Sequence, residues 1–349
     1  MLTEIAAVVL VGLLGWTYQA TRPPPPKICG SPEGPPVTSP RIRLSDGRHL
    51  AYRESGVPKD EAKYRIIVTH GFDNSKEFSL NASQELIEEL RIYFVSFDRA
   101  GYGDSDPNPR RSVKSEAFDI QELADQLDIG SKFYVIAVSM GAYAGWSCLK
   151  YIPHRLAGAS LIVPVVNYWW PSLPANLSRT ALREKAVPDQ WIFRIAHYAP
   201  RLLYWWRSQK WLPPAPMFEG HPVIFSRKDK EILTKMPDAL RPGQDKVTQQ
   251  GVFESLHRDL MVGFGHWSFD PLDLSSPFPE SEGSVQIWQG YEDRMVPSLL
   301  QRYVADRLPW IKYYEVHDGG HFFIYERSFS EAVLRALLLG EEPPSTLLD

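Results

Sequence analysis

The sequence predicts an α/β protein in which helices cover both faces of a mostly parallel sheet and a helical segment is inserted late in the chain. Apolar segments such as 65–71 (RIIVTHG) and 132–139 (KFYVIAVS) alternate with helix patterns. Strands that are apolar on both faces are typical of a parallel sheet buried between two helix layers. The alternation stops near Asn167 and resumes at 283–290, and the residues between are helical in pattern. These observations favour one large α/β unit with an insertion.

The individual elements can be justified in chain order. Residues 41–54 alternate apolar and polar side chains around a Ser-Asp-Gly turn, which indicates a hairpin. After it, continuous apolar runs predict buried strands and amphipathic patterns predict helices. The predicted strands are 65–71, 93–98, 132–139, 156–166, 283–290 and 311–317, and the predicted helices are 83–91, 116–129, 140–152 and 328–340.

Composition narrows the function classes. The chain is 44% hydrophobic and 23% charged, with a formal net charge of -4. Nucleic-acid-binding proteins usually carry a basic excess, so a nucleic-acid partner is not expected. The two cysteines, Cys29 and Cys148, fall in a proline-rich segment and in a predicted core helix. Neither a disulfide between them nor a cysteine metal site is therefore expected.

The N-terminal segment 1–21 is predicted to be a membrane anchor. Its apolar run from Ile5 to Tyr18 is short beside the about 17–25 residues of a typical spanning helix, but the aromatic residues Trp16 and Tyr18 lie at its C-terminal end and the basic residues Arg22 and Lys27 follow it. Glu4 at its start argues against a cleaved signal peptide, which stays open as the alternative. The basic residues after the run predict a cytosolic body, whereas a signal peptide would send it into the secretory pathway. Residues 22–40 are rich in proline and glycine and predict a semi-rigid linker without packed structure.

A serine at the junction of a predicted strand and helix is the candidate nucleophile. Residues 134–145 read YVIAVSMGAYAG, so Ser139 ends a buried strand and starts a helix. This is the context of a nucleophile elbow, a strained turn that presents a serine at the top of a sheet. Gly141 supplies one small neighbour, and Ala137 stands where the pattern usually has glycine. The alternative is an ordinary turn that packs a helix close to a strand.

A serine hydroxyl becomes a useful nucleophile only when a base takes its proton and an acid holds the base. In this topology the acid and then the histidine follow the serine along the chain. Asp293 lies three residues beyond the predicted strand 283–290 and is the candidate acid. Its neighbour Glu292 is an alternative that we expect to be a solvated loop charge. Asp270 is a second alternative, expected to be a turn residue.

Two histidines follow Asp293, and His321 is the favoured base. It follows a pair of glycines, which gives the backbone freedom to place the imidazole over the serine. His317 ends the last predicted strand and is expected to be satisfied locally.

The loop after strand 65–71 is predicted to provide an anion site. Backbone N–H groups of Phe72 and Met140 are candidates to stabilise a developing oxyanion. His70 precedes the serine in sequence and is expected to shape this loop rather than act as a base.

Five segments of the chain stand in the order and spacing of a known superfamily: HGFDNS (70–75), FDRAGYGDSDP (97–107), AVSMGAYAG (137–145), WQGYEDRMVP (288–297) and HDGGHFF (317–323). With them the chain resembles the α/β-hydrolase superfamily over about residues 40–340. It looks most like the serine hydrolases with a helical cap, and among them plant members with an N-terminal hydrophobic anchor. The resemblance implies an eight-stranded, mostly parallel sheet, with a core of 41–167 and 281–349 and a cap of 168–280 inserted after the sixth strand.

The resemblance also carries roles onto individual residues. Ser139, Asp293 and His321 take the nucleophile, acid and base positions. The turn that contains Asp98, Arg99, Gly101 and Gly103 is implied to be structural.

The nucleophile position indicates the reaction class. Epoxide hydrolases and dehalogenases of this fold carry Asp there, so Ser139 favours acyl transfer. We expect a carboxylesterase- or lipase-like serine hydrolase that cleaves an ester-like bond of an apolar or lipid-like small molecule and needs no cofactor or metal. The alternative is a receptor-like ligand-binding protein of the same fold with little or no turnover.

Six of the eleven tryptophans fall between 169 and 211. They are expected to pack the cap on the core, to line an apolar acyl pocket, or to touch lipid. We expect Trp169, Trp170 and Trp205 to contact the substrate, and we treat contact of the cap with a bilayer as a hypothesis.

Overall fold

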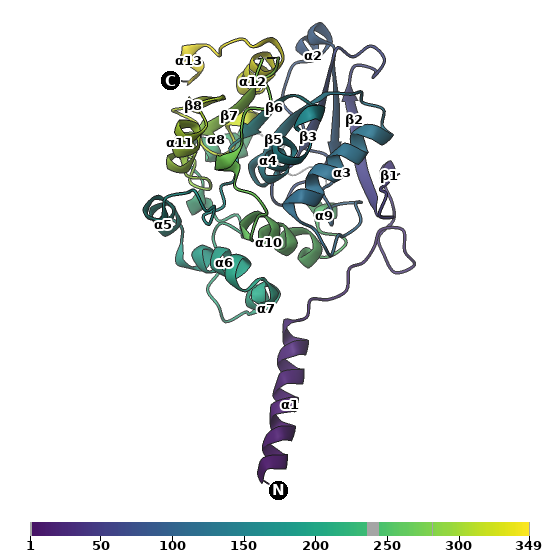
Figure 1. The fold of residues 1–349 in the computed structure, drawn as a ribbon, viewed down its shortest axis with the longest axis vertical. Helices are drawn as coiled ribbons and strands as arrows, with labels where there is room; N and C mark the ends of the chain where they lie inside the picture. The colour runs from purple at the N-terminus through teal and green to yellow at the C-terminus, as the bar shows by residue number, and fades with distance from the viewer. Residues whose placement is uncertain (1, 236–243, 281, 349) are drawn as a thin grey trace.

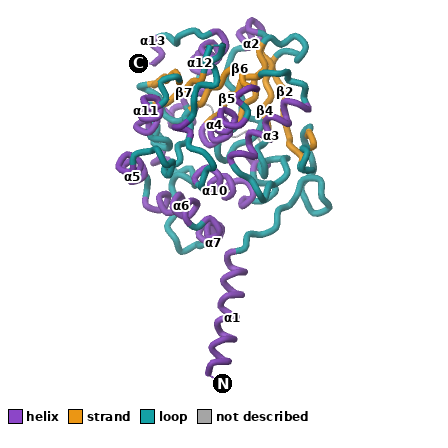
Figure 2. The backbone as a smooth tube through the Cα atoms, in the orientation of Figure 1, coloured by secondary structure: helices purple, strands orange, loops and turns teal. Residues whose placement is uncertain are grey.

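The computed structural model describes residues 2–235, 244–280 and 282–348. In these residues an eight-stranded sheet has the order β1-β2-β4-β3-β5-β6-β7-β8, with helices on both faces (Figures 1 and 2). Strands β3 to β8 are parallel, whereas β1 pairs with β2 and β2 with β4 in antiparallel fashion. The strands are β1 Arg41–Arg43, β2 His49–Gly56, β3 Tyr64–Thr69, β4 Ile92–Phe97, β5 Phe133–Val138, β6 Leu156–Ile162, β7 Val285–Gly290 and β8 Ile311–Val316. The predicted mostly parallel, eight-stranded α/β architecture is confirmed.

Two buried clusters occupy the two faces of the sheet. Helices α3 (Val113–Gln126), α4 (Ala142–Tyr151) and α11 (Ser298–Arg307) contribute to one cluster. Helices α2 (Gln84–Leu90) and α12 (Arg327–Leu339) contribute to the other. Neighbouring strand residues alternate between the clusters because successive side chains of a strand point to opposite faces. Of these helices, α11 lies between β7 and β8, where the sequence patterns had not identified a helix.

We call residues 168–280, between β6 and β7, the insertion, and its described residues contain several helices. They are α5 Ala175–Arg183, α6 Val187–Tyr198, α7 Leu203–Ser208, α8 Arg227–Lys235, α9 Gln244–Val247 and α10 Arg258–Phe264. A buried ion pair attaches α10 to the sheet, because Arg99 Nη2 donates to Asp259 Oδ2 at 2.9 Å and neither side chain is exposed. Burial alone would raise the pKa of Asp259, but Arg99 and Arg111 lower this pKa to about 2. The pair is therefore charged at any physiological pH. The sequence prediction of a structural role for Arg99 agrees with this contact.

The N-terminal helix α1 (Leu2–Thr21) extends away from the body, and its C-terminal end contacts α7 of the insertion (Figure 1). The linker 22–40 contains no helix or strand. The prediction that it lacks packed structure is nevertheless wrong. Cys29 is buried, and its backbone N–H donates to Gln250 Oε1 at 3.0 Å. The linker is thus docked on the body through contacts distant in sequence.

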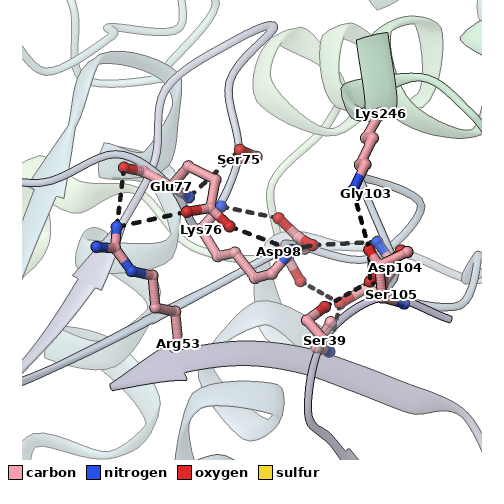
Figure 3. A network of polar contacts seen from close by, with 12 residues as sticks. Ser39, Arg53, Ser75, Lys76, Glu77, Asp98, Gly103, Asp104, Ser105 and Lys246 are labelled. Atoms are coloured by element: carbon pink, nitrogen blue, oxygen red, sulfur yellow. Dashed lines mark hydrogen bonds and ion pairs between the residues drawn. The ribbon is translucent and has the colours of Figure 1, made fainter. Parts of the chain in front are cut away.

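The turn after β4 anchors the end of this linker. Asp98 is fully buried and accepts hydrogen bonds from the backbone N–H and the Nζ of Lys76 at 2.8 and 2.9 Å (Figure 3). The backbone N–H of Asp104 donates to the same carboxylate at 3.1 Å. The Asp104 carboxylate in turn accepts from Thr38 Oγ1 at 2.9 Å and from the Ser39 hydroxyl. Asp98 and its neighbours therefore have the structural role that the sequence predicted.

Candidate active site

Ser139 lies at the sharp turn between β5 and α4. Its φ is 52°, and a 3-10 turn, Ser139–Gly141, leads into the helix. A positive φ is uncommon outside glycine and marks local strain of the kind found at functional sites. A Cβ added to Gly141 would lie 2.5 Å from the carbonyl oxygen of His70, so this position requires glycine. The turn therefore has the geometry of a nucleophile elbow.

The structure explains why Ala137 can replace the usual glycine. Ala137 is fully buried and points toward α4, where Gly145 faces it. A Cβ added to Gly145 would lie 3.0 Å from the Ala137 Cβ and 2.5 Å from Leu161 Cδ2. A glycine at the strand position would leave room for the helix to pack closely. Here the strand carries Ala137, and the room is left instead by Gly145 on α4.

This complementarity predicts a stability effect. Gly145→Ala is expected to lower the free energy of unfolding by roughly 1–3 kcal/mol, because overpacking a close helix–strand contact forces a shift. Adding Ala137→Gly to that variant should restore part of the loss, since it removes one of the two clashing groups. Urea unfolding of wild type, both single variants and the double variant measures the coupling. Independent effects of the two substitutions would contradict the explanation.

The side chains of Ser139, His321 and Asp293 come from three separate turns and form a chain of contacts. His321, on the loop after β8, lies with its Nε2 3.0 Å from Ser139 Oγ. Its Nδ1 lies 2.7 Å from Asp293 Oδ2 on the loop after β7. The other carboxylate oxygen of Asp293 accepts backbone N–H groups of Met295 and Val296, each at 2.8 Å. The acid is therefore fixed by main chain, and the arrangement can move a proton from serine to histidine.

The imidazole of His321 is biased toward its protonated form. Burial disfavours the charged ring and is the largest single influence on its pKa, but the charge and hydrogen bond of Asp293, followed by the charge of Asp229, act in the opposite direction. The net result is a pKa of His321 raised above its ordinary value. A base with such a pKa is stabilised as the imidazolium that forms when the serine is deprotonated.

The rival residues lie elsewhere. Glu292 is exposed, and Asp270 caps a short helical turn by accepting from the backbone N–H of Leu272 at 2.9 Å. His317 is exposed, with its ring against Tyr291 at a centroid distance of 5.9 Å. Among the residues that the structure describes, His321 is the side chain hydrogen-bonded to Ser139 Oγ, and none of these three residues takes its place.

The peptide between Gly71 and Phe72 is held from one side. His70 Nδ1 lies 2.8 Å from the Gly71 carbonyl oxygen, and Arg99 Nη2 donates to the same oxygen at 3.0 Å. Burial, and next the Arg99 charge, lower the pKa of His70 well below its ordinary value, so the ring is neutral. In a trans peptide the N–H points opposite to the carbonyl. The N–H of Phe72 therefore points away from His70 and Arg99.

The second predicted anion donor, Met140, is the middle residue of the 3-10 turn after Ser139. N–H groups in the first turn of a helix have no acceptor inside the helix. Phe72, Met140 and Ser139 all line one cavity.

That cavity is narrow and apolar, and its volume is about 50 Å³. Its walls come from the core loops and from the insertion, and they are Phe72, Ser139, Met140, Val165, Val166, Tyr168, Phe193, Met217, Phe218, Leu260, Phe264, Met295, Val296, Pro297, Leu300 and His321. Three of these wall residues carry polar side-chain groups: the Ser139 hydroxyl, the Tyr168 phenol and the His321 ring.

The three tryptophans predicted to contact substrate are not among these walls. Trp169 stacks on His197 at a centroid distance of 4.3 Å, and Trp170 packs edge-on against Trp146. Trp205 lies on α7 beside Trp206. Their neighbour Tyr168 does line the cavity, whereas these tryptophans pack against other rings of the insertion and core.

The sequence analysis missed most of the wall residues. Met217 and Phe218 follow a Pro-Pro-Ala-Pro segment that carries no periodic signal. It also missed Asp229, whose carboxylate contacts the backbone N–H of Phe322 next to His321 at 2.8 Å. No local motif marks these residues.

Comparison with known proteins adds the family. A model of the alpha/beta hydrolase family matches residues 66–336. Among solved structures, the Rv0554 protein of Mycobacterium tuberculosis is 18% identical with a TM-score of 0.58, over 86% of this chain and 98% of that chain. An enol-lactonase from Burkholderia xenovorans LB400 is 16% identical with a TM-score of 0.56, over 86% and 100%. An esterase from Exiguobacterium antarcticum is 16% identical with a TM-score of 0.51, over 82% and 93%. At these identities the similarity shows a shared fold, and no curated protein matches the chain.

Proposed function

The chain belongs to the alpha/beta hydrolase family, and on that premise we propose that it is a serine hydrolase that cleaves an ester-like acyl bond. The observation that carries the proposal is the unbroken contact from Ser139 through His321 to Asp293, at 3.0 and 2.7 Å. Covalent labelling of Ser139 by a fluorophosphonate is the experiment that tests it.

The proposed reaction proceeds in two halves. Ser139 Oγ attacks the acyl carbon while its proton passes to His321 Nε2, and the carbonyl oxygen becomes an oxyanion. His321 then gives the proton to the leaving alkoxide, which departs as an alcohol and leaves an acyl ester on Ser139. In the second half His321 takes a proton from water, the hydroxide attacks the ester, and the acid is released as Ser139 regains its proton.

Two backbone donors are proposed to stabilise the oxyanion. The orientation of the Gly71–Phe72 peptide supports this role for the Phe72 N–H, since His70 and Arg99 hold its opposite edge. The Met140 N–H is the second donor. Donors that are already oriented need no reorganisation during the reaction, and each contributes about 3–4 kcal/mol to lowering a barrier.

The lining and the volume of the cavity favour a substrate whose acyl group is apolar and of modest size. Its lining is aliphatic, aromatic and methionine side chains, and the polar side-chain groups among them are the Ser139 hydroxyl, the Tyr168 phenol and the His321 imidazole. A volume of about 50 Å³ holds only a few water molecules, so a short or slender acyl chain fits without rearrangement. We therefore expect short-chain esters to be better substrates than long-chain ones in the absence of a membrane.

We further propose that α1 anchors the protein in a membrane, with the body on the cytosolic side. The window Glu4–Thr21 has a mean hydropathy of 1.2 and is not buried in the structure. A helix of 20 residues is about 30 Å long, which matches the hydrocarbon core of a bilayer.

The insertion is proposed to rest on the same membrane. On α6, Val187, Trp191 and Tyr198 are spaced to share one helix face and are exposed to 63%, 47% and 68%. Leu202 and Trp211, which flank α7 in the sequence, are exposed as well, and we include them in this apolar patch; α7 is the helix of the insertion that contacts α1 (Figure 1). The exposed basic residues Arg201 and Lys210 accompany it, a combination typical of segments at a lipid surface.

Vesicle binding tests the role of this patch. A form lacking residues 1–25 keeps the linker contacts at Cys29 and is expected to bind vesicles of phosphatidylcholine and phosphatidylserine. Replacing Trp191 and Trp211 together by Glu should weaken binding roughly tenfold or more, because two aromatic side chains lose apolar burial. Phe118→Glu, at an exposed aromatic on α3, serves as the matched control. Equal binding by the double variant and the control would show that lipid does not contact the patch.

A further inference from the structure

A buried carboxylate of the insertion contacts the loop that carries His321. Asp229 lies in the first turn of α8, and its exposed fraction is 0%. Its Oδ1 accepts a hydrogen bond from the backbone N–H of Phe322 at 2.8 Å. Because Phe322 directly follows His321, the contact restrains the main chain on the C-terminal side of the imidazole.

The same carboxylate packs against the main chain before His321. A Cβ added to Gly320 would lie 2.3 Å from each of the two Asp229 oxygens. Gly320 and Gly319 form a pair with few intrinsic restraints, since glycine has a wide choice of backbone angles. Asp229 occupies the space beside this pair and so limits the motion of the loop on both sides of His321.

Helix α8 is itself well attached, which makes it a firm support. Ser226 and Asp229 cap the helix reciprocally: the Asp229 N–H donates to Ser226 Oγ at 3.0 Å, and the Ser226 N–H donates to Asp229 Oδ2 at 3.1 Å. Lys228 Nζ lies 3.8 Å from Asp318 and 3.7 Å from Glu326, on either side of the His321 loop. The insertion therefore holds this loop through several contacts.

We propose that Asp229 is a positioning residue for His321, holding its loop in place and stabilising the imidazolium with its negative charge. The proposal rests on the proposed function in that it takes His321 to be the base. If Asp229 has this role, the insertion both forms walls of the cavity and takes part in the proton transfer.

Charged groups face His321 from three elements. Asp293 comes from the loop after β7, Asp229 from α8, and Lys185 from the connection between α5 and α6. Burial lowers the pKa of His321 and Lys185 opposes protonation, but Asp293, and after it Asp229, raise this pKa to above its ordinary value. Removal of the Asp229 charge must therefore shift the titration of His321 toward lower pH.

Two substitutions separate charge from helix capping. Asp229→Asn keeps an oxygen to accept from the Phe322 N–H and removes the charge, while its NH₂ group replaces the oxygen that accepts from the Ser226 N–H. Ser226→Ala breaks the reciprocal cap of the same helix and leaves the carboxylate in place. NMR titration of the full chain in detergent micelles follows the His321 ring, whose signal is assigned by its loss in His321→Gln. We expect a lower titration midpoint in Asp229→Asn and an unchanged midpoint in Ser226→Ala. An unchanged midpoint in Asp229→Asn, or an equal shift in both variants, would overturn the proposal.

A second measurement follows the reactivity of Ser139. The rate of fluorophosphonate labelling should fall at low pH as His321 becomes protonated, and this fall should occur at lower pH in Asp229→Asn. Asp229→Ala also loses the hydrogen bond to Phe322, and its maximal labelling rate is expected to fall roughly 10- to 100-fold through misplacement of the base. A maximal rate equal to that of wild type would refute the positioning role. Failure of wild type to react at all would count against the proposed function, whereas the NMR titration decides the role of Asp229 independently.

Discussion

Replacement of Ser139 by alanine is expected to abolish covalent labelling by a fluorophosphonate and to lower turnover of a short-chain ester by roughly a million-fold. The variant loses the hydroxyl that lies 3.0 Å from His321 Nε2. Residual hydrolysis would depend on the oxyanion donors and on substrate binding alone. Active-site labelling and steady-state kinetics measure the two effects.

Ser147→Ala is the matched control for this experiment. Ser147 is a fully buried serine of α4, and its hydroxyl donates to the Tyr143 carbonyl at 2.8 Å, away from the cavity. Its replacement removes a hydroxyl from the same helix and should leave labelling intact. A folded wild-type protein that resists labelling would instead favour the receptor-like alternative, in which the same fold binds a ligand with little or no turnover.

Asp293→Asn is expected to lower kcat about 10⁴-fold while the fold is retained. The reason is the tautomer of His321. In wild type the carboxylate accepts the Nδ1 proton, which leaves Nε2 free to accept from Ser139. Asparagine would keep one oxygen for the N–H groups of Met295 and Val296 and turn its NH₂ group toward Nδ1. The ring proton would then move to Nε2, where it blocks proton transfer from the serine.

Glu292→Gln tests whether the acid has been identified correctly. Glu292 is adjacent in sequence but exposed, so its replacement should change kcat little. Hydrolysis of a chromogenic short-chain ester, with circular dichroism as a check on folding, compares the two variants. Loss of activity in Glu292→Gln and its retention in Asp293→Asn would assign the acid to the neighbouring residue.

Part of this site could be predicted because its residues follow strands. Ser139, Asp293 and His321 lie one, three and five residues beyond the ends of β5, β7 and β8, which are parallel. The carboxyl ends of parallel strands lie at one edge of a sheet, so side chains on the following loops can meet. Strand patterns and short motifs thus indicated three residues that the structure brings into contact, although Ser139 and His321 are 182 positions apart.

The errors have a common origin. Trp169 and Tyr168 are adjacent in an aromatic segment, and nothing in its composition shows which of them faces the cavity. The linker was misjudged because its contacts, such as that of Cys29 with Gln250, join positions 221 apart. The Asp229 contact with Phe322 likewise spans 93 positions and carries no motif.

By itself the sequence determined the order of the strands and of the core helices other than α11, the helical segment between β6 and β7, and the residues at the strand ends, because local periodicity and turn chemistry act between near neighbours. Only the tertiary structure decided that a helix glycine, Gly145, accommodates Ala137, that the linker docks on the body, and that Asp229 supports the loop of His321. These contacts depend on side-chain packing between segments that are far apart in the chain, and such packing is established only when the sheet and the insertion come together.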